Sequence, residues 1–170
     1  MTPVNRFWYA VKTASRAEKK VADRIGQEGL EVFLPMQEVI KQWSDRKKKI
    51  KVPLISGFVF VHITESEIAK LHAIQGVVGV LRYLNKPAII LPYEISNLKI
   101  LINEKVELEN CTITEWLKGD SIYIESGVFA GLKGKIIKQL EQVYIIVKLS
   151  GVGFHFQVKL PSSFARKEHI

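Results

Sequence analysis

The chain has 170 residues, of which 47% are hydrophobic and 25% charged, which is the composition of an ordinary globular protein with one medium or two small domains. No apolar run approaches the ~20 residues that span a bilayer, and no apolar segment follows a basic start, so we expect no membrane span and no signal peptide. The single cysteine, Cys111, excludes an internal disulfide and favours a cytoplasmic location.

The net charge of +8 is distributed unevenly along the chain. Residues 1–105 contain 17 lysines and arginines against 10 acidic residues, whereas residues 106–170 contain 8 against 7. A basic part followed by a nearly neutral part indicates two different roles, with a polyanion close to the first.

The N-terminal part begins with a predicted strand and a predicted helix. Residues 7–13 are rich in aromatic and β-branched side chains, as strands are. Ser15 and Glu18 then match a capping box, and Gly29 is a plausible end for the helix that follows. The apolar stripe of this helix consists of Ala17, Val21 and Ile25.

The elements that follow are short. Residues 38–52 form a predicted basic hairpin, 57–63 a strand, 65–74 a helix, and 77–84 with 88–91 a strand pair. Pro92 is a favourable first residue for a third helix that ends near residue 105. Short strands alternating with helices predict an α+β domain over residues 1–105.

The stretch Phe58–Ile63 raises a question about its two faces. Side chains alternate along a strand, so Phe58, Phe60 and His62 share one face, and Val59, Val61 and Ile63 share the other. The valine face is ordinary core. The aromatic face is explained either by packing under a helix or neighbouring domain, or by an exposed apolar patch that binds a partner.

The C-terminal part has a different texture. Runs such as SIYIE, VYIIVKL and FHFQVKL are separated by glycines and carry no helical pattern. We therefore predict a linker over 106–117 and a small five-stranded β-barrel over 118–170. The β-branched and aromatic segments 144–147 and 154–158 disfavour helix, which predicts that this part is a β-barrel at all times and does not refold into helices.

No pattern in the sequence requires an enzyme. The four histidines are scattered, the single cysteine has no metal-ligand spacing, and no phosphate-binding or nucleophile motif is present. We expect no catalytic residue, no metal and no cofactor.

Two basic clusters are candidates for nucleic-acid contacts. Arg16, Lys20 and Arg24 are spaced for one face of a helix, and like charges at that spacing are mildly destabilising. The second cluster, at the turn of the predicted hairpin, includes Arg46, Lys47 and Lys48. Both clusters are open to a second interpretation as solvated surface, but clustered charge on a projecting element suits phosphate contacts.

These parts resemble the N-terminal domain of NusG-type transcription elongation factors followed by a KOW motif. The resemblance is carried by Trp8-Tyr9, the basic helix, the hairpin, residues 53–61 and the stretch 119–134. Residues 42–48, QWSDRKK, further resemble specialised NusG paralogues of the UpxY type, akin to RfaH, which antiterminate capsular-polysaccharide operons. The family usually has a proline and a tyrosine where this chain has Ser56 and Phe58.

The resemblance implies partners and site residues. The N-terminal domain is expected to dock on the clamp helices of the largest RNA polymerase subunit through an apolar patch, with Trp8 facing the core. The patch residues that match are Tyr9, Phe58, Phe60 and Tyr83. The two basic clusters would face upstream or non-template DNA, and the KOW domain would bind Rho, a small-subunit ribosomal protein, or both, through Phe129 and Ile145.

The expected function is that of a monomeric, cytoplasmic elongation factor that suppresses pausing or termination. Two alternatives remain open from the sequence. One is a general NusG that assists Rho, and the other is an RNA- or ribosome-binding KOW protein, which the small net charge of residues 106–170 argues against.

Overall fold

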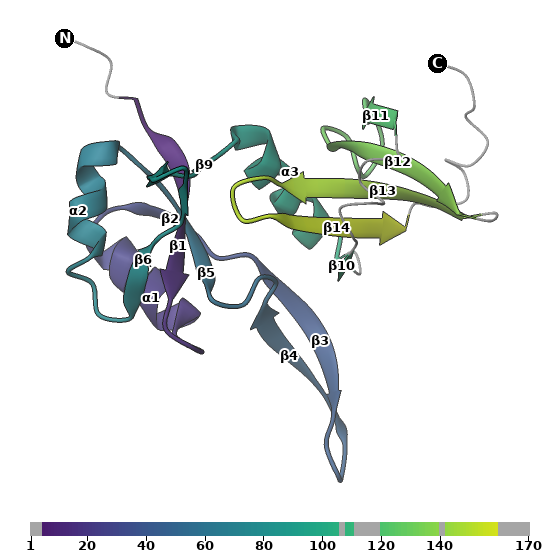
Figure 1. Ribbon diagram of the computed structural model, residues 1–170. Coiled ribbons are helices and arrows are strands. Elements are labelled where there is room, and N and C mark those ends of the chain that lie inside the picture. Colours follow the sequence, from purple (N-terminus) through teal and green to yellow (C-terminus); the bar gives the residue numbers. More distant parts are fainter. Residues whose placement is uncertain (1–4, 106–107, 111–119, 140–141, 160–170) are drawn as a thin grey trace. The chain divides into compact units, whose positions relative to one another are not determined.

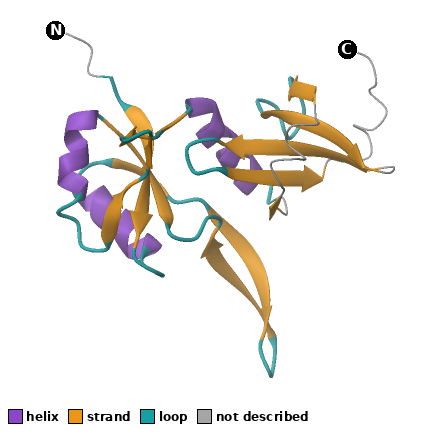
Figure 2. Cartoon of the chain, viewed as in Figure 1, coloured by secondary structure: helices purple, strands orange, loops and turns teal. Residues whose placement is uncertain are grey.

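The computed structural model describes residues 5–105, 108–110, 120–139 and 142–159, in two compact units that comprise residues 1–92 and 93–170. Figure 1 labels their helices and strands, and Figure 2 shows the same elements by type. Both units combine antiparallel strands with few helices, as the sequence predicts. No helix in the described ranges is long and apolar enough to cross a membrane. Cys111 lies outside those ranges.

The N-terminal unit is built on one antiparallel sheet in the order β2-β5-β1-β6, with β9 paired to β1. Its central pair places Tyr9 opposite Val61 and Ala10 opposite Phe60. The strands are β1 (Phe7–Thr13), β2 (Glu31–Phe33), β5 (Phe58–Ile63), β6 (Val77–Val80) and β9 (Ile89–Ile90).

Two helices cover one face of this sheet. Val21 and Ile25 of α1 (Glu18–Gln27) and Leu71 of α2 (Ile68–Leu71) pack with the valine face of β5 in a single buried cluster. The predicted 65–74 helix is shorter, because a 3₁₀ turn, η1 (Glu65–Glu67), precedes α2. Thr64 and Glu67 form a capping box at the start of η1.

Two hairpins extend this unit. The predicted basic hairpin is confirmed as β3 (Met36–Gln42) paired with β4 (Lys47–Pro53). It projects as a long arm (Figure 1). The second hairpin, β7 (Arg82–Tyr83) and β8 (Lys86–Pro87), turns through Leu84 and Asn85, which both have positive φ. Such φ values at both central residues define the type I′ turns that match strand twist.

The C-terminal unit is an antiparallel sheet in the order β10-β14-β13-β12-β11, which accords with the expected KOW region. Its buried core includes Ile124, Phe129, Leu132 and Ile145. The strands are β10 (Leu108–Asn110), β11 (Asp120–Tyr123), β12 (Lys133–Gln139), β13 (Gln142–Leu149) and β14 (Phe154–Lys159).

Helix α3 (Pro92–Asn103) packs with the C-terminal sheet, in the compact unit that comprises residues 93–170. The domain boundary at residue 105 stays a prediction. Leu101 joins the core of the C-terminal sheet, and two buried polar side chains, Glu94 and Asn97, bond to that sheet. Strand β10 lies inside the predicted linker.

The start of α1 also differs from the prediction. Arg16 adopts a left-handed φ of 57°, Ala17 is the N-cap, and no side chain caps the helix. Glu18 instead reaches the segment before β5, where its Oε1 accepts a hydrogen bond from the Gly57 N–H at 2.7 Å. The Gly57 carbonyl accepts a bond from the Thr13 N–H at 2.9 Å, so this turn is held at both backbone groups.

We expect Glu18→Ala to destabilise the protein by about 1.5–3 kcal/mol, since the hydrogen bond that the buried carboxylate accepts from the Gly57 N–H is lost. The denaturant midpoint of unfolding measures the change. Glu18→Gln keeps an oxygen acceptor and should lose less. Asp23→Ala, at an exposed position of the same helix, should stay within about 0.5 kcal/mol of wild type. Equal loss in Glu18→Ala and Asp23→Ala would contradict the assigned bond.

Candidate functional site

The aromatic face of the N-terminal sheet is defined by strand register. Residues directly opposite in an antiparallel pair share a face. Ala10 lies opposite Phe60, and Trp8 lies opposite His62, whereas Tyr9 lies opposite Val61. Tyr9 is therefore part of the helix-covered core, where it is 2% exposed. The prediction that Tyr9 shares a face with Phe58 and Phe60 is wrong, whereas Trp8 is buried as predicted, although on the aromatic side of the sheet.

The aromatic residue of β1 that shares a face with Phe58 and Phe60 of β5 is Trp8. Its ring stacks on the His62 ring with centroids 5.0 Å apart, and His62 Nδ1 lies 2.8 Å from Oε2 of Glu31. Phe33 of β2 lies opposite Phe60, with ring centroids 6.4 Å apart. We define the aromatic face as Trp8, Phe33, Phe58, Phe60 and His62.

The predicted patch residues differ in accessibility. Phe60 is fully buried, Phe58 is half-buried, and Tyr83 is 72% exposed on the β7–β8 hairpin. The sequence pattern does identify the two faces of β5. It does not identify which of the aromatic side chains reach the surface, because that depends on what lies over the sheet.

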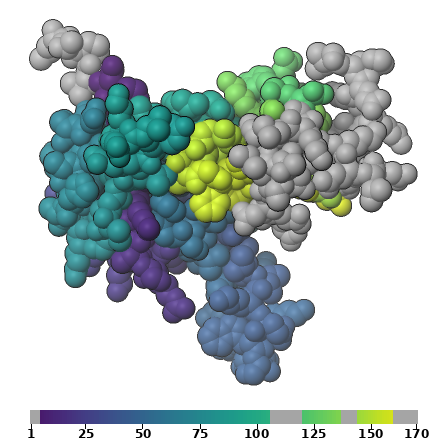
Figure 3. Space-filling view, in the orientation of Figure 1, coloured from purple at the N-terminus to yellow at the C-terminus, as the bar shows by residue number. Residues whose placement is uncertain are grey.

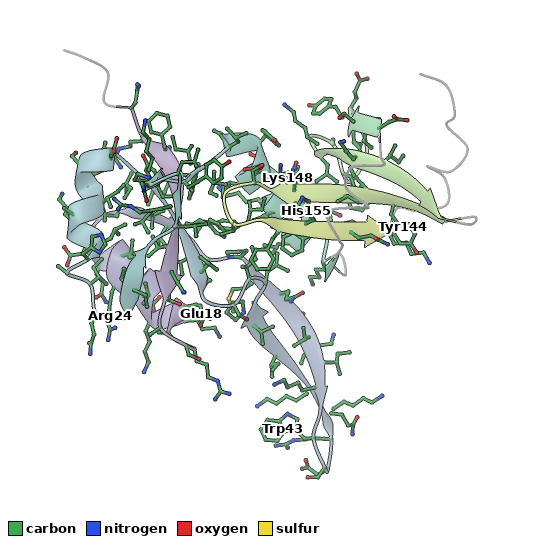
Figure 4. The ribbon with its side chains drawn as sticks, in the orientation of Figure 1. Glu18, Arg24, Trp43, Tyr144, Lys148 and His155 are labelled. Atoms are coloured by element: carbon green, nitrogen blue, oxygen red, sulfur yellow. The ribbon has the colours of Figure 1, made fainter. Side chains whose placement is uncertain are left out.

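The basic residues of the first helix are not equivalent. Arg16 lies before the helix, so the predicted regular spacing on one helix face is interrupted at its first member. Lys20 is exposed on α1. The Arg24 guanidinium donates a hydrogen bond to the Gln75 carbonyl at 2.6 Å and ties α1 to the segment before β6. Figure 4 labels Arg24 and Glu18 near α1.

The basic hairpin gathers most of the clustered positive charge. Residues 36–53 contain six lysines and arginines against two acids. The predicted contacts Arg46, Lys47 and Lys48 are all exposed. Register adds a residue that sequence reasoning does not assign, because Lys41 lies directly opposite Lys48. Like charges in that position destabilise a strand pair.

Trp43 lies at the distal end of the hairpin (Figure 4) and is 55% exposed. The sequence signal for it is a large aromatic residue beside a turn, where no core is available. Its backbone N–H donates to the Arg46 carbonyl at 2.8 Å, which continues the strand pairing beyond Gln42 and Lys47.

The predicted partner contacts of the C-terminal unit are core residues. Phe129 is 5% exposed and Ile145 is buried completely, both in the cluster that includes Leu101 of α3. Their assignment as surface contacts is wrong in this structure, since alternation along β13 turns Ile145 inward. Within the described part of this unit, the large hydrophobic residues that are exposed are instead Tyr93, Tyr123 and Val128.

The C-terminal unit also contains a buried histidine. His155 of β14 lies opposite Lys148 of β13. Burial lowers the pKa of His155 and the Lys148 charge lowers it further, against the opposing effect of a hydrogen bond with the Gly153 backbone. Among the described residues no group of three or more histidine, cysteine or carboxylate side chains is arranged to hold a metal ion.

The described residues thus form an α+β unit with a projecting basic hairpin and a small unit built on an antiparallel sheet. The family model "Transcription termination factor nusG" matches residues 6–99, more than half of the chain. The chain belongs to the NusG family and is thus a transcription factor of that family, not an enzyme.

Two solved structures are similar to the chain. "Domain interaction in Thermotoga maritima NusG" matches with a TM-score of 0.52 at 20% identity, covering 94% of this chain and 95% of that one. The "MjSpt4:Spt5 complex conformation A" matches with a TM-score of 0.32 at 22% identity, covering 89% and 91%. The first supports the fold. None of the curated proteins matches the chain significantly.

Proposed function

We propose that this protein binds elongating RNA polymerase through the aromatic face and the basic hairpin and suppresses pausing or termination. The observation that carries the proposal is the one-sided cover of the N-terminal sheet. Helices α1 and α2 both pack on the valine face, whereas on the aromatic face Phe33, Phe58 and His62 keep part of their surface exposed. Family membership makes the clamp helices of the largest polymerase subunit the expected partner.

The mechanism follows from differential binding. An apolar contact on one side and cations near nucleic acid on the other would hold the polymerase clamp closed. A factor that binds the closed state better reduces the population of paused states that need an open clamp. Lys20 and the hairpin cations Arg46, Lys47 and Lys48 supply the nucleic-acid side.

The proposal extends to the kind of factor and to the C-terminal partner. The tip segment 42–48 supports an operon-specific antiterminator of the type that acts on capsular-polysaccharide operons. The C-terminal unit would recruit Rho or a small-subunit ribosomal protein. The exposed Tyr123 and Val128 are better candidates for that contact than the buried Phe129 and Ile145.

The first test is the affinity for assembled elongation complexes. Phe58→Ala should weaken binding about 30-fold, as expected for a contact worth about 2 kcal/mol. Phe58 is half-buried and is chosen over Phe60 because truncating a fully buried phenylalanine would itself cost about 3–5 kcal/mol of stability. The circular dichroism spectrum and the thermal midpoint verify folding.

Val78→Ala is the matched control, since Val78 is 61% exposed on β6 of the same unit and lies outside the aromatic face. Its affinity should equal that of wild type. Wild-type affinity in a folded Phe58→Ala variant would reject the docking assignment. Termination assays with and without Rho give the sign of the effect, and increased termination would reject antitermination.

A further inference from the structure

The distal half of the β3–β4 hairpin presents an aromatic ring and three cations on one face. Side chains alternate along strands, so Lys41 and Trp43 point to the same side of β3. Lys48 lies opposite Lys41, and the Trp43–Arg46 backbone bond continues this pairing to the tip. We define the stacking face as Lys41, Trp43, Arg46 and Lys48.

The other face of the hairpin differs in chemistry. Gln42 lies opposite Lys47, Ile40 opposite Lys49, and Glu38 opposite Lys51. Ile40 is 64% exposed and provides an apolar group of similar accessibility to Trp43 but without an aromatic ring. Ile40 therefore serves as a control residue that separates the effect of exposed apolar area from the effect of an aromatic ring.

The stacking face lowers the stability of the isolated protein or adds little to it. Lys41 and Lys48 repel each other across the ladder, and a 55% exposed indole gains little from burial. Among the described residues Trp43 has no aromatic or cationic stacking partner. Figure 3 shows the blue hairpin as an arm that extends away from the rest of the N-terminal unit.

We propose that the stacking face binds a single-stranded nucleic acid, with Trp43 stacked on an unpaired base and Lys41, Arg46 and Lys48 on the adjacent phosphates. Cations combined with an aromatic ring are the elements that bind single strands. The excess of cations disfavours a basic or apolar protein surface. A duplex keeps its base faces within its own stack and offers the indole no plane.

This inference rests on the proposed function only for the source of the nucleic acid, because an elongation complex exposes unpaired DNA and RNA. It concerns the hairpin alone and is tested without polymerase. Failure here would leave the aromatic-face docking intact, and failure of the Phe58→Ala experiment would leave the stacking face intact.

The experiment uses the full chain and fluorescence anisotropy with labelled oligothymidylate and oligouridylate of about 20 nucleotides, long enough for the site sizes of single-strand binders. Trp43→Ala should weaken binding about 5- to 150-fold, the range for loss of one stacked base. Trp43→Phe should restore most of the affinity. The oligomer that binds more tightly identifies DNA or RNA as the natural source.

Two further variants distinguish base stacking from apolar burial and from charge attraction. Ile40→Ala removes exposed apolar area from the opposite face and should leave affinity unchanged. Lys48→Gln should reduce the dependence of log affinity on log salt by about 0.7, whereas Trp43→Ala should leave that slope unchanged.

The proposal is overturned if Trp43→Ala binds oligothymidylate and oligouridylate as tightly as wild type. It is also overturned if Ile40→Ala and Trp43→Ala weaken binding equally, or if a duplex of the same length binds more tightly than both single strands. Trp43 is exposed on an arm, so these variants are expected to fold, and circular dichroism verifies that they do.

Discussion

Replacing Gly134 with alanine is expected to destabilise the C-terminal unit by about 3 kcal/mol or more, at the upper end of the range for overpacking. Gly134 lies in β12 opposite Ile122, and an added methyl group would meet the Ile146 carbonyl oxygen and the Ile145 Cγ1 atom, the latter at 2.8 Å. A carbonyl within a strand ladder cannot move aside without breaking its pairing. The side chain of Ile145 is also fixed, because it is buried in the core.

Amide resonances of the C-terminal unit, followed through a denaturant titration, measure this effect separately from the N-terminal unit. Gly79→Ala is the control, because Gly79 also lies in a strand but has no atom within 4 Å of the added methyl group. It should remain within about 0.5 kcal/mol of wild type. Equal midpoints for Gly134→Ala and wild type would show that the strand pair can open without cost.

The sequence predicts strands more accurately than it predicts their environment. The alternation in Phe58–Ile63 correctly separates two faces, because it depends only on the two-residue period of a strand. Assigning Tyr9 and Trp8 to those faces requires the register of β1 against β5, which is set by the whole sheet. That register reverses the two residues and changes the composition of the candidate site.

Helix α3 shows the same limit for a helix. Its apolar spacing predicts a helix correctly but does not indicate what the helix packs against. The residues that indicate what α3 packs against are polar. Glu94 and Asn97 are completely buried one turn apart, and buried polar side chains need specific partners. Those partners, Lys133 of β12 and Ser150 in the turn after β13, belong to the C-terminal unit.

The sequence predicts the positive charge of the candidate nucleic-acid site but not which residues share a face there. The run Arg46–Lys49 indicates a polyanion from the sequence alone. Only the pairing of β3 with β4 brings Lys41 next to Lys48 and puts both on the side of Trp43.

The predicted capping box of Ser15 and Glu18 does not form, because the backbone at Arg16 has a left-handed φ and lies outside the helix.

The attachment of α3 to the C-terminal sheet leads to the second large effect. Asn97 Nδ2 donates to the Lys133 carbonyl at 2.7 Å, and Asn97 Oδ1 accepts from the Lys133 N–H at 3.0 Å. Asn97→Asp preserves the shape of the side chain but replaces the donor with an acceptor. An ionised carboxylate would then face the Lys133 carbonyl in a buried site, so we expect a loss of about 3–5 kcal/mol at neutral pH.

The pH dependence distinguishes this mechanism from a simple packing defect. A protonated carboxyl group can donate to the Lys133 carbonyl and accept from its N–H, which restores both bonds. The folded state should therefore raise the pKa of the new carboxyl group above its unfolded value of about 3.9. The folded state binds more protons than the unfolded state in that window, so stability falls as the pH rises through it.

We therefore expect the difference between Asn97→Asp and wild type to be larger at pH 8 than at pH 5, as measured by the free energy of unfolding of the C-terminal unit. Asn103→Asp places the same new charge at an exposed position of the same helix and should show no such dependence. A pH-independent loss would mean that the side chain only fills space. No loss at neutral pH would mean that α3 is not held to the sheet through Lys133.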